Sequence, residues 1–136
     1  MIVVDTNIIS YLYLSGERSL QAEQLLLADS HWCAPVLWRS EFRSVLSRYL
    51  RKSILSIDEV LHIIQQAEIL LTDNEYEIPS SQIMQLVNSS NCSAYDCEFV
   101  ALARHLGVPL VTADKQLLRE FPMVAISMEA FTGSIS

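Results

Sequence analysis

Acidic side chains stand at the ends of two apolar segments of this chain. Asp5 directly follows the β-branched run at residues 2–4, and Asp114 comes shortly after the apolar run at 108–112. Runs this short and apolar predict strands that are buried on both faces of a parallel sheet. In open α/β sheets the carboxyl ends of such strands form the edge where ligands bind. Each Asp could instead only cap a helix or shape a turn, so its role depends on what else reaches this edge.

A third carboxylate, Asp96, falls inside the apolar face of a predicted helix. That helix covers residues 93–107, with Ser93 as its cap and Gly107 at its C-terminal end. A charge in an apolar arc costs free energy unless a metal, a cation or hydrogen bonds compensate it. The alternative is an Asp side chain bent back onto the helix N-terminus, where negative charge is favourable. Both interpretations remain open at this point.

The chain is acidic overall, but its basic residues are concentrated in one place. The net charge is −7, and five of the nine Lys and Arg residues lie in a helix predicted over 35–52. In projection, Glu41 lies at the border of the apolar stripe of this helix, and Arg48 and Lys52 return to nearly the same line. One cationic helix on an acidic body indicates a local anion contact or an ordinary solvated face with salt bridges. It argues against a broad electrostatic coat for nucleic acid.

Four carboxylates therefore become candidates for one site at the edge of the sheet. Mutually repelling acids make sense around a hard divalent cation, which takes oxygen ligands. The chemistry that this donor set suits is metal-assisted hydrolysis of a phosphodiester. The three cysteines and three histidines lack the spacing of a zinc site, and we expect buried free thiols. The candidate residues are Asp5, Glu41, Asp96 and Asp114.

The length and the sequence pattern predict a single domain. With 136 residues and 51% hydrophobic composition, the chain can bury a core without disulfides or metal staples. No apolar run reaches the length of a membrane span and no signal peptide is evident, so we expect a cytoplasmic protein without membrane segments. Strands and helices alternate in the order expected for an α/β fold with a central parallel sheet flanked by α-helices. Strands are predicted at 2–4, 31–34, 75–78, 108–112 and 124–127; helices at 7–14, 17–28, 35–52, 57–71, 81–87, 93–107 and 115–120; and a frayed tail at 132–136.

Four short segments, taken in order, resemble a known family. They are residues 4–7, 40–42, 93–103 and 110–114, and they read VDTN, SEF, SAYDCEFVALA and LVTAD. These segments resemble the signatures of PIN-domain ribonucleases, most closely those of VapC-like toxins of type II toxin–antitoxin systems. The resemblance covers residues 2 to about 126, which makes 1–136 a single PIN-like, Rossmann-like domain with its core at about 2–126.

The resemblance implies an endoribonuclease that depends on Mg²⁺ or Mn²⁺, forms a homodimer and is inhibited by a partner antitoxin. Carried over by position, it implies an acidic quartet in which Asp5 and Asp96 hold the metal directly. Glu41 and Asp114 would complete the metal site or bind through water, and a metal-activated water would hydrolyse the RNA phosphodiester. The resemblance also implies that Asn7 and Thr112 orient the metal ligands. Arg48 and Lys52 are candidate contacts to the RNA backbone.

Two other functions compete with this interpretation. A phosphoaspartyl phosphohydrolase of the haloacid dehalogenase type would use Asp5 as a nucleophile. That chemistry needs an acid two residues further on, where this chain has Asn7, and a Lys near the phosphate, for which Lys115 is a loose candidate. The second competitor is a non-catalytic PIN-like module for protein interaction. The intact quartet speaks against it, since repelling acids have no evident purpose without a cation.

Overall fold

Strand β1 (Ile2–Val4) lies at the centre of a five-stranded sheet in the computed structural model, which describes residues 1–135. All pairings are parallel, and the strand order is β3-β2-β1-β4-β5. Val3 pairs with Cys33 on one side and with Leu110 on the other. All three residues of β1 are buried, as expected for a central parallel strand with helices on both faces. The other strands are β2 (Trp32–Pro35), β3 (Glu75–Tyr76), β4 (Leu110–Val111) and β5 (Ala125–Ile126).

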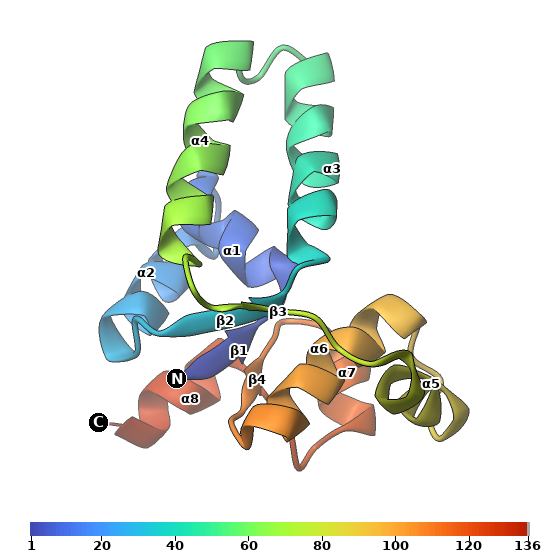
Figure 1. Ribbon diagram of the computed structural model, residues 1–136. Helices are drawn as coiled ribbons and strands as arrows, with labels where there is room; N and C mark the ends of the chain where they lie inside the picture. The colour runs from blue at the N-terminus through green and yellow to red at the C-terminus, as the bar shows by residue number, and fades with distance from the viewer. Residues whose placement is uncertain (136) are drawn as a thin grey trace.

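Eight helices surround the sheet among the described residues (Figure 1). Their local signals are those expected from the sequence: Ser56 and Glu59 form a capping box at the start of α4, Ser93 caps α6, and Gly107 ends α6 in the left-handed conformation. None of the helices in residues 1–135 is long and apolar enough to span a membrane. The helices are α1 (Thr6–Tyr13), α2 (Ser19–Ala28), α3 (Trp38–Arg51), α4 (Ile57–Leu70), α5 (Ser80–Asn88), α6 (Ala94–Leu106), α7 (Lys115–Glu120) and α8 (Met128–Ile135).

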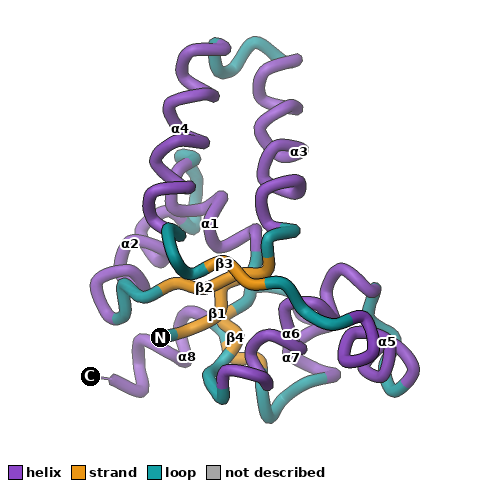
Figure 2. The backbone as a smooth tube through the Cα atoms, viewed as in Figure 1, coloured by secondary structure: helices purple, strands orange, loops and turns teal. Residues whose placement is uncertain are grey.

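Helices α3 and α4 form an antiparallel pair that projects away from the sheet (Figure 1). A short loop joins them at the far end of this arm (Figure 2). The base of α3 is packed against α1 and buries Trp38 and Phe42, whose ring centroids are 5.7 Å apart. The arm matters for the site because the first turn of α3 carries Glu41.

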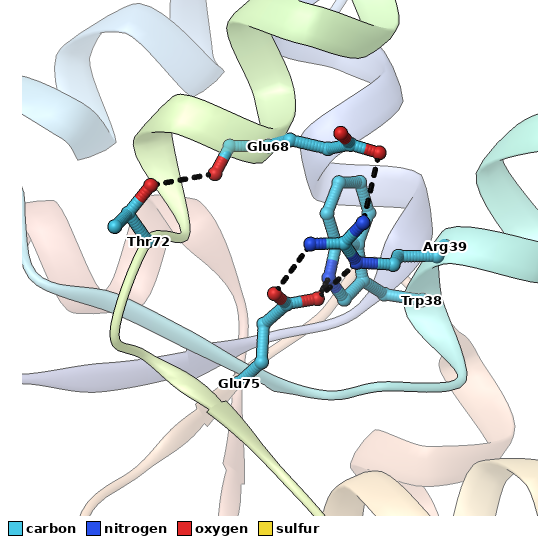
Figure 3. A network of polar contacts seen from close by, with 5 residues as sticks. All are labelled: Trp38, Arg39, Glu68, Thr72 and Glu75. Atoms are coloured by element: carbon cyan, nitrogen blue, oxygen red, sulfur yellow. Dashed lines mark hydrogen bonds and ion pairs between the residues drawn. The ribbon is translucent and has the colours of Figure 1, made fainter.

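A cluster of polar contacts fixes the base of the arm to the sheet (Figure 3). The Arg39 guanidinium donates to both carboxylate oxygens of Glu75, at 2.6 and 2.8 Å, and to Glu68 Oε2 at 3.0 Å. The Trp38 indole N–H donates to Glu75 Oε2 at 2.7 Å. These contacts connect α3, α4 and β3. Arg39, one of the five cations of the basic segment, is therefore committed to the fold and is not free to bind an anion.

Several boundaries differ from the prediction by one to three residues, and two differences have a clear physical cause. Helix α3 begins at Trp38 and not at Pro35, because Pro35 pairs with Tyr76 at the end of β2. The frayed tail expected at 132–136 is wrong for Thr132 and Gly133, which lie within helix α8. The Thr132 hydroxyl donates to the Met128 carbonyl at 2.9 Å, and α8 packs against α2, which gives the segment a tertiary partner that the sequence did not reveal. Ser136 lies outside the described residues.

Candidate metal and nuclease site

One pocket of about 240 Å³ is lined by all four of the predicted acids. Asp5 comes from the carboxyl end of β1, Glu41 from α3, Asp96 from the first turn of α6, and Asp114 from the turn after β4. Because β1 and β4 are parallel neighbours, their carboxyl ends meet at the same sheet edge. The fold thus brings together side chains that are far apart in the sequence. The pocket is completed by Thr6, Asn7, Ser44, Val45, Arg48 and Phe99.

Asp5 is the most deeply buried of the four acids, with a residual exposure of 7%. It is the N-cap of α1: its Oδ1 accepts a hydrogen bond from the Ile8 N–H at 3.1 Å. Its Oδ2 accepts a hydrogen bond from the Thr112 hydroxyl. Burial raises the pKa of Asp5 from 3.8 to about 6; the hydrogen bonds oppose this shift, and the charges of Asp114 and Asp96 add to it. Asp5 therefore caps the helix, as one interpretation of the sequence held, and also faces the pocket.

Glu41 reaches the pocket from the arm. Its Oε1 accepts a hydrogen bond of 2.7 Å from the hydroxyl of Thr6, which lies in the first turn of α1. The pKa of Glu41 is raised, mainly by burial and further by the charge of Asp96, whereas the Thr6 hydroxyl lowers it. The carboxylate is thus held at the pocket by a neutral donor, since no described cation forms an ion pair with it.

Asp96 occupies the third position of α6, where its backbone N–H donates to the Ser93 hydroxyl at 3.1 Å. Burial raises its pKa, and the nearby charge of Asp114 raises it further. The helix N-terminus therefore does not outweigh the cost of burying this carboxylate beside another acid.

Asp114 combines a capping role with a place at the pocket. Its Oδ1 accepts hydrogen bonds from the N–H groups of Gln116 and Leu117, at 2.8 and 3.2 Å, and so starts α7. Its own backbone N–H donates to the Thr112 hydroxyl at 3.0 Å. The Thr112 hydroxyl thus accepts from one strand-end acid and donates to the other, Asp5. The Thr112 side chain is completely buried.

The positive charge around the pocket is small. Arg48 lines it, whereas Lys52 lies one turn further along α3, at the exposed C-cap of that helix, and does not. Neither residue has an ion-pair partner in the part of the chain that the structure describes. Asn7 lines the pocket as an exposed side chain, and Lys115 is not part of the lining. One Arg against four carboxylates leaves the pocket strongly negative.

The chemistry of the donor set fits a hard divalent cation, because carboxylate oxygens are the ligands that Mg²⁺ and Mn²⁺ prefer. The raised pKa values of Asp5, Glu41 and Asp96 point the same way, since burial and, to a smaller extent, the neighbouring carboxylates raise them, and a bound cation would oppose both effects. Within residues 1–135, however, no three His, Cys, Asp or Glu side chains form a group that could hold a metal ion as they stand. Common ligation of one ion would therefore require some of these side chains to reorient.

Two contributors at this edge were not recognised as such in the sequence. Thr6 lies in the segment at residues 4–7 and was not among the candidate residues, yet its hydroxyl donates a hydrogen bond to Glu41. Glu98 was not among the candidate acids either, but it is only partly exposed, and the charge of Glu41 contributes to the raised pKa of Glu98 after the larger effect of burial. The position of Thr6 directly after the strand-end Asp5 was the available signal for the first. The sequence held no comparable signal for Glu98.

A larger cavity of about 530 Å³ lies elsewhere, between α5 and α6. Its lining includes Gln82, Gln85, Arg104 and His105, and none of the four acids. Size alone therefore does not identify the chemical site, and the smaller pocket is distinguished by its charge.

Comparisons with known proteins agree with this architecture. The family model described as "PIN domain" matches residues 2–122. Ribonuclease VapC3 of Pyrobaculum aerophilum is 30% identical over 124 residues, which are 89% of this chain and 95% of that protein. The crystal structure of PAE2754 from Pyrobaculum aerophilum is similar with a TM-score of 0.75 at 17% identity, over 98% of this chain and 95% of the other. A toxin–antitoxin complex from Klebsiella pneumoniae contains a chain with a TM-score of 0.70 at 20% identity, over 94% and 98%.

Proposed function

This chain belongs to the PIN-domain family, and from that membership and its acidic pocket we propose that it is a divalent-metal-dependent endoribonuclease. We further propose that it is the toxin component of a toxin–antitoxin pair and acts in the cytoplasm. The similarity to a protein named as a ribonuclease, over nearly the full length of both chains, supports the nuclease class. The single observation that carries the proposal is the convergence of four carboxylates from four separate elements on one pocket.

Within this proposal, Asp5, Glu41, Asp96 and Asp114 would hold Mg²⁺ or Mn²⁺. When bound, such an ion polarises the scissile phosphate and lowers the pKa of a water molecule. Asp5 and Asp96 are the candidate direct ligands, and Glu41 and Asp114 would complete the site or bind through water.

The polar residues around the quartet have distinct tasks in the proposal. Thr112 would hold the Asp5 carboxylate and the Asp114 backbone in fixed positions relative to each other, because its one hydroxyl bonds to both. Asn7 is an exposed residue that lines the pocket, and its side chain would orient the metal ligands or the RNA. Arg48 lines the pocket and would contact the RNA backbone, and Lys52 extends the positive charge along α3.

The proposal is tested by Asp96→Asn, with Asp73→Asn as the matched control. Asp73 is exposed and has a positive φ of 65°, a conformation that Asn adopts readily, so this control makes the same chemical change away from the pocket. We expect Asp96→Asn to abolish Mg²⁺-dependent RNA cleavage and to retain the wild-type circular dichroism spectrum, and Asp73→Asn to cleave like the wild type. Retained cleavage in a folded Asp96→Asn protein would refute the assignment.

The non-catalytic alternative is separated by calorimetric titration with Mn²⁺. A working site should bind the ion with measurable heat, and Asp96→Asn should weaken that binding. A PIN-like scaffold that has no use for a cation should give no saturable heat at all. The phosphoaspartyl alternative needs a lysine near the phosphate. Lys115, its candidate, is not among the residues that line the pocket.

We also propose how a partner antitoxin would inhibit the enzyme. A pocket with four carboxylates and one Arg attracts a single cationic side chain, which would compete with the metal. We therefore expect the antitoxin to place an Arg or Lys near Asp5 and an amphipathic helix against the neighbouring surface. A structure of the complex in which the antitoxin is wholly remote from the carboxylates would contradict this. We also propose that the chain forms the homodimer that its resemblance to VapC-like toxins implies, and light scattering on the purified chain tests this separately.

A further inference from the structure

The hydrogen bond between Thr6 and Glu41 joins two elements that approach the pocket from different directions. Thr6 is the first residue of α1, directly after the strand-end Asp5, whereas Glu41 belongs to α3, the helix that forms the arm. The Thr6 Oγ1 donates to Glu41 Oε1 at 2.7 Å, and Thr6 is 6% exposed. The bond is thus a side-chain link between the sheet edge and the arm.

The donor end of this link is rigid. The Thr6 carbonyl accepts a hydrogen bond of 2.9 Å from the Ser10 hydroxyl, in addition to its place in the first helical turn. A buried β-branched side chain has few rotamers available, so the direction of the hydroxyl is restricted. The acceptor end is different, because a Glu side chain has three rotatable bonds and considerable rotamer entropy.

Among residues 1–135 this is the one hydrogen bond that the Glu41 carboxylate accepts, and no ion pair reaches it. Without the Thr6 hydroxyl the carboxylate would have no described protein donor to restrict its orientation. The bond uses Oε1, so that the second oxygen, Oε2, keeps its capacity for another partner at the pocket.

We propose that Thr6 is a positioning residue, whose hydroxyl holds the Glu41 carboxylate in the orientation that the site uses for a divalent cation. This inference rests on the proposed metal-dependent function. Thr6 acts through Glu41 and is not itself a ligand. Groups that hydrogen-bond to metal-ligating carboxylates typically contribute a factor of about 10 to 100 in metal affinity or activity.

The test uses the affinity for Mn²⁺, measured by calorimetry on the full chain. Thr6→Val keeps the shape of the side chain and removes the donor, whereas Thr6→Ser keeps the donor and removes a methyl group. Thr72→Val is the matched control: its hydroxyl donates to the Glu68 carbonyl at 3.0 Å on α4, at the base of the arm and outside the pocket (Figure 3). We expect the dissociation constant for Mn²⁺ to rise about tenfold in Thr6→Val, and to stay within about twofold of the wild type in Thr6→Ser and Thr72→Val.

A double-mutant cycle shows whether Thr6 works through Glu41. In a Glu41→Gln background, Thr6→Val should have no further effect on the Mn²⁺ affinity. An equally large loss in that background, or an equal loss in Thr6→Ser and Thr6→Val, would overturn the inference, because the hydroxyl would then not be acting on the Glu41 carboxylate. Unchanged Mn²⁺ affinity in Thr6→Val would overturn it as well.

Failure of the inference and failure of the proposed function give different results. If the wild type shows no saturable Mn²⁺ binding, the proposed function fails and the inference with it. If the wild type binds Mn²⁺ and Asp96→Asn does not, the site stands, and the Thr6 variants then decide the inference alone. Thermal unfolding of each variant confirms that the compared proteins are folded.

Discussion

Asp5 and Thr112 lie 107 positions apart in the chain, and their side chains are hydrogen-bonded in the interior, at the point where β1 and β4 end. The same Thr112 hydroxyl accepts a hydrogen bond from the Asp114 N–H. One buried hydroxyl therefore links the carboxylate of Asp5 to the backbone of Asp114, the second strand-end acid. It also uses both its donor and an acceptor position to do so.

Replacement of Thr112 by Val should damage the site more than the fold. The variant keeps the volume but leaves Asp5 Oδ2 without its donor, so the pKa of Asp5 should rise further above about 6. We expect a loss of cleavage of about 10-fold or more and a fall in the free energy of unfolding of about 1–2 kcal/mol near neutral pH. Steady-state cleavage and urea unfolding measure the two effects, and Thr112→Ser should restore most of both. Full activity in Thr112→Val would show that this hydroxyl has no part in the site.

Asp5→Asn should stabilise the metal-free protein while it abolishes cleavage. Because the pKa of Asp5 rises from 3.8 to about 6 on folding, the folded protein binds a proton there that the unfolded chain has released. Its contribution to stability is therefore greatest below pH 3.8 and is lost as the pH rises through about 6. Asn carries no charge and can still accept from the Ile8 N–H, so the variant avoids this loss.

The expected gain for Asp5→Asn is about 1–3 kcal/mol near neutral pH with a chelator present. This gain should disappear as the pH falls below 3.8, the ordinary pKa of an Asp side chain. Urea unfolding at several pH values measures it. An Asn variant less stable than the wild type at neutral pH would contradict the electrostatic account.

Arg48→Ala should weaken RNA binding with little effect on the chemical step. Arg48 lines the acidic pocket and has no described ion-pair partner, so its charge is available to a phosphate. We expect KM for RNA to rise about 3- to 10-fold, the salt dependence of binding to become shallower, and kcat to change little. Lys52→Ala should have a smaller effect in the same direction, since Lys52 does not line the pocket. Arg119→Ala on α7 serves as the control. An equal effect in all three variants would indicate that RNA binding responds only to the overall charge of the protein.

Glu75→Gln should destabilise the arm without touching the acids. It removes the charged partner of Arg39 and weakens the acceptor of the Trp38 N–H. We expect a loss of about 1–2 kcal/mol in the free energy of unfolding, discounted for the partial exposure of Arg39. The exposed neighbour Glu77→Gln is the matched control and should change little.

The pH dependence of this loss has a defined sign. The hydrogen bonds from Arg39 hold the pKa of Glu75 below its usual range. The contribution of Glu75 to the free energy of unfolding is therefore fully present above the ordinary Glu pKa of 4.5. It is lost as the pH falls through the lowered pKa of Glu75 in the folded protein. The difference between wild type and Glu75→Gln should shrink in acid, as measured by urea unfolding. A constant difference across this range would argue against the ion pair.

Local signals in the sequence were sufficient for most elements and for the identity of the acids. The capping box at Ser56, the cap at Ser93 and the left-handed Gly107 are interactions within a few residues, and the sequence displays them directly. The end of the β2 pairing and helix α8 were not predicted correctly, because each depends on a partner segment that is distant in the chain: β3 for Pro35, and α2 for α8. The roles of Thr6 and Glu98 depend on the approach of α3 and α6, which local patterns do not encode.

The sequence by itself determined which side chains carry charge and that several of them follow buried strands or lie on apolar helix faces. Residue type and short-range periodicity are properties of the chain before it folds. Only the tertiary structure decided that Asp5, Glu41, Asp96 and Asp114 line one pocket, and that Arg39 serves the fold while Arg48 faces the acids. The physical reason is that the proximity of charges is set by strand order and helix packing, and burial at that meeting point then raises the pKa values of Asp5, Glu41 and Asp96.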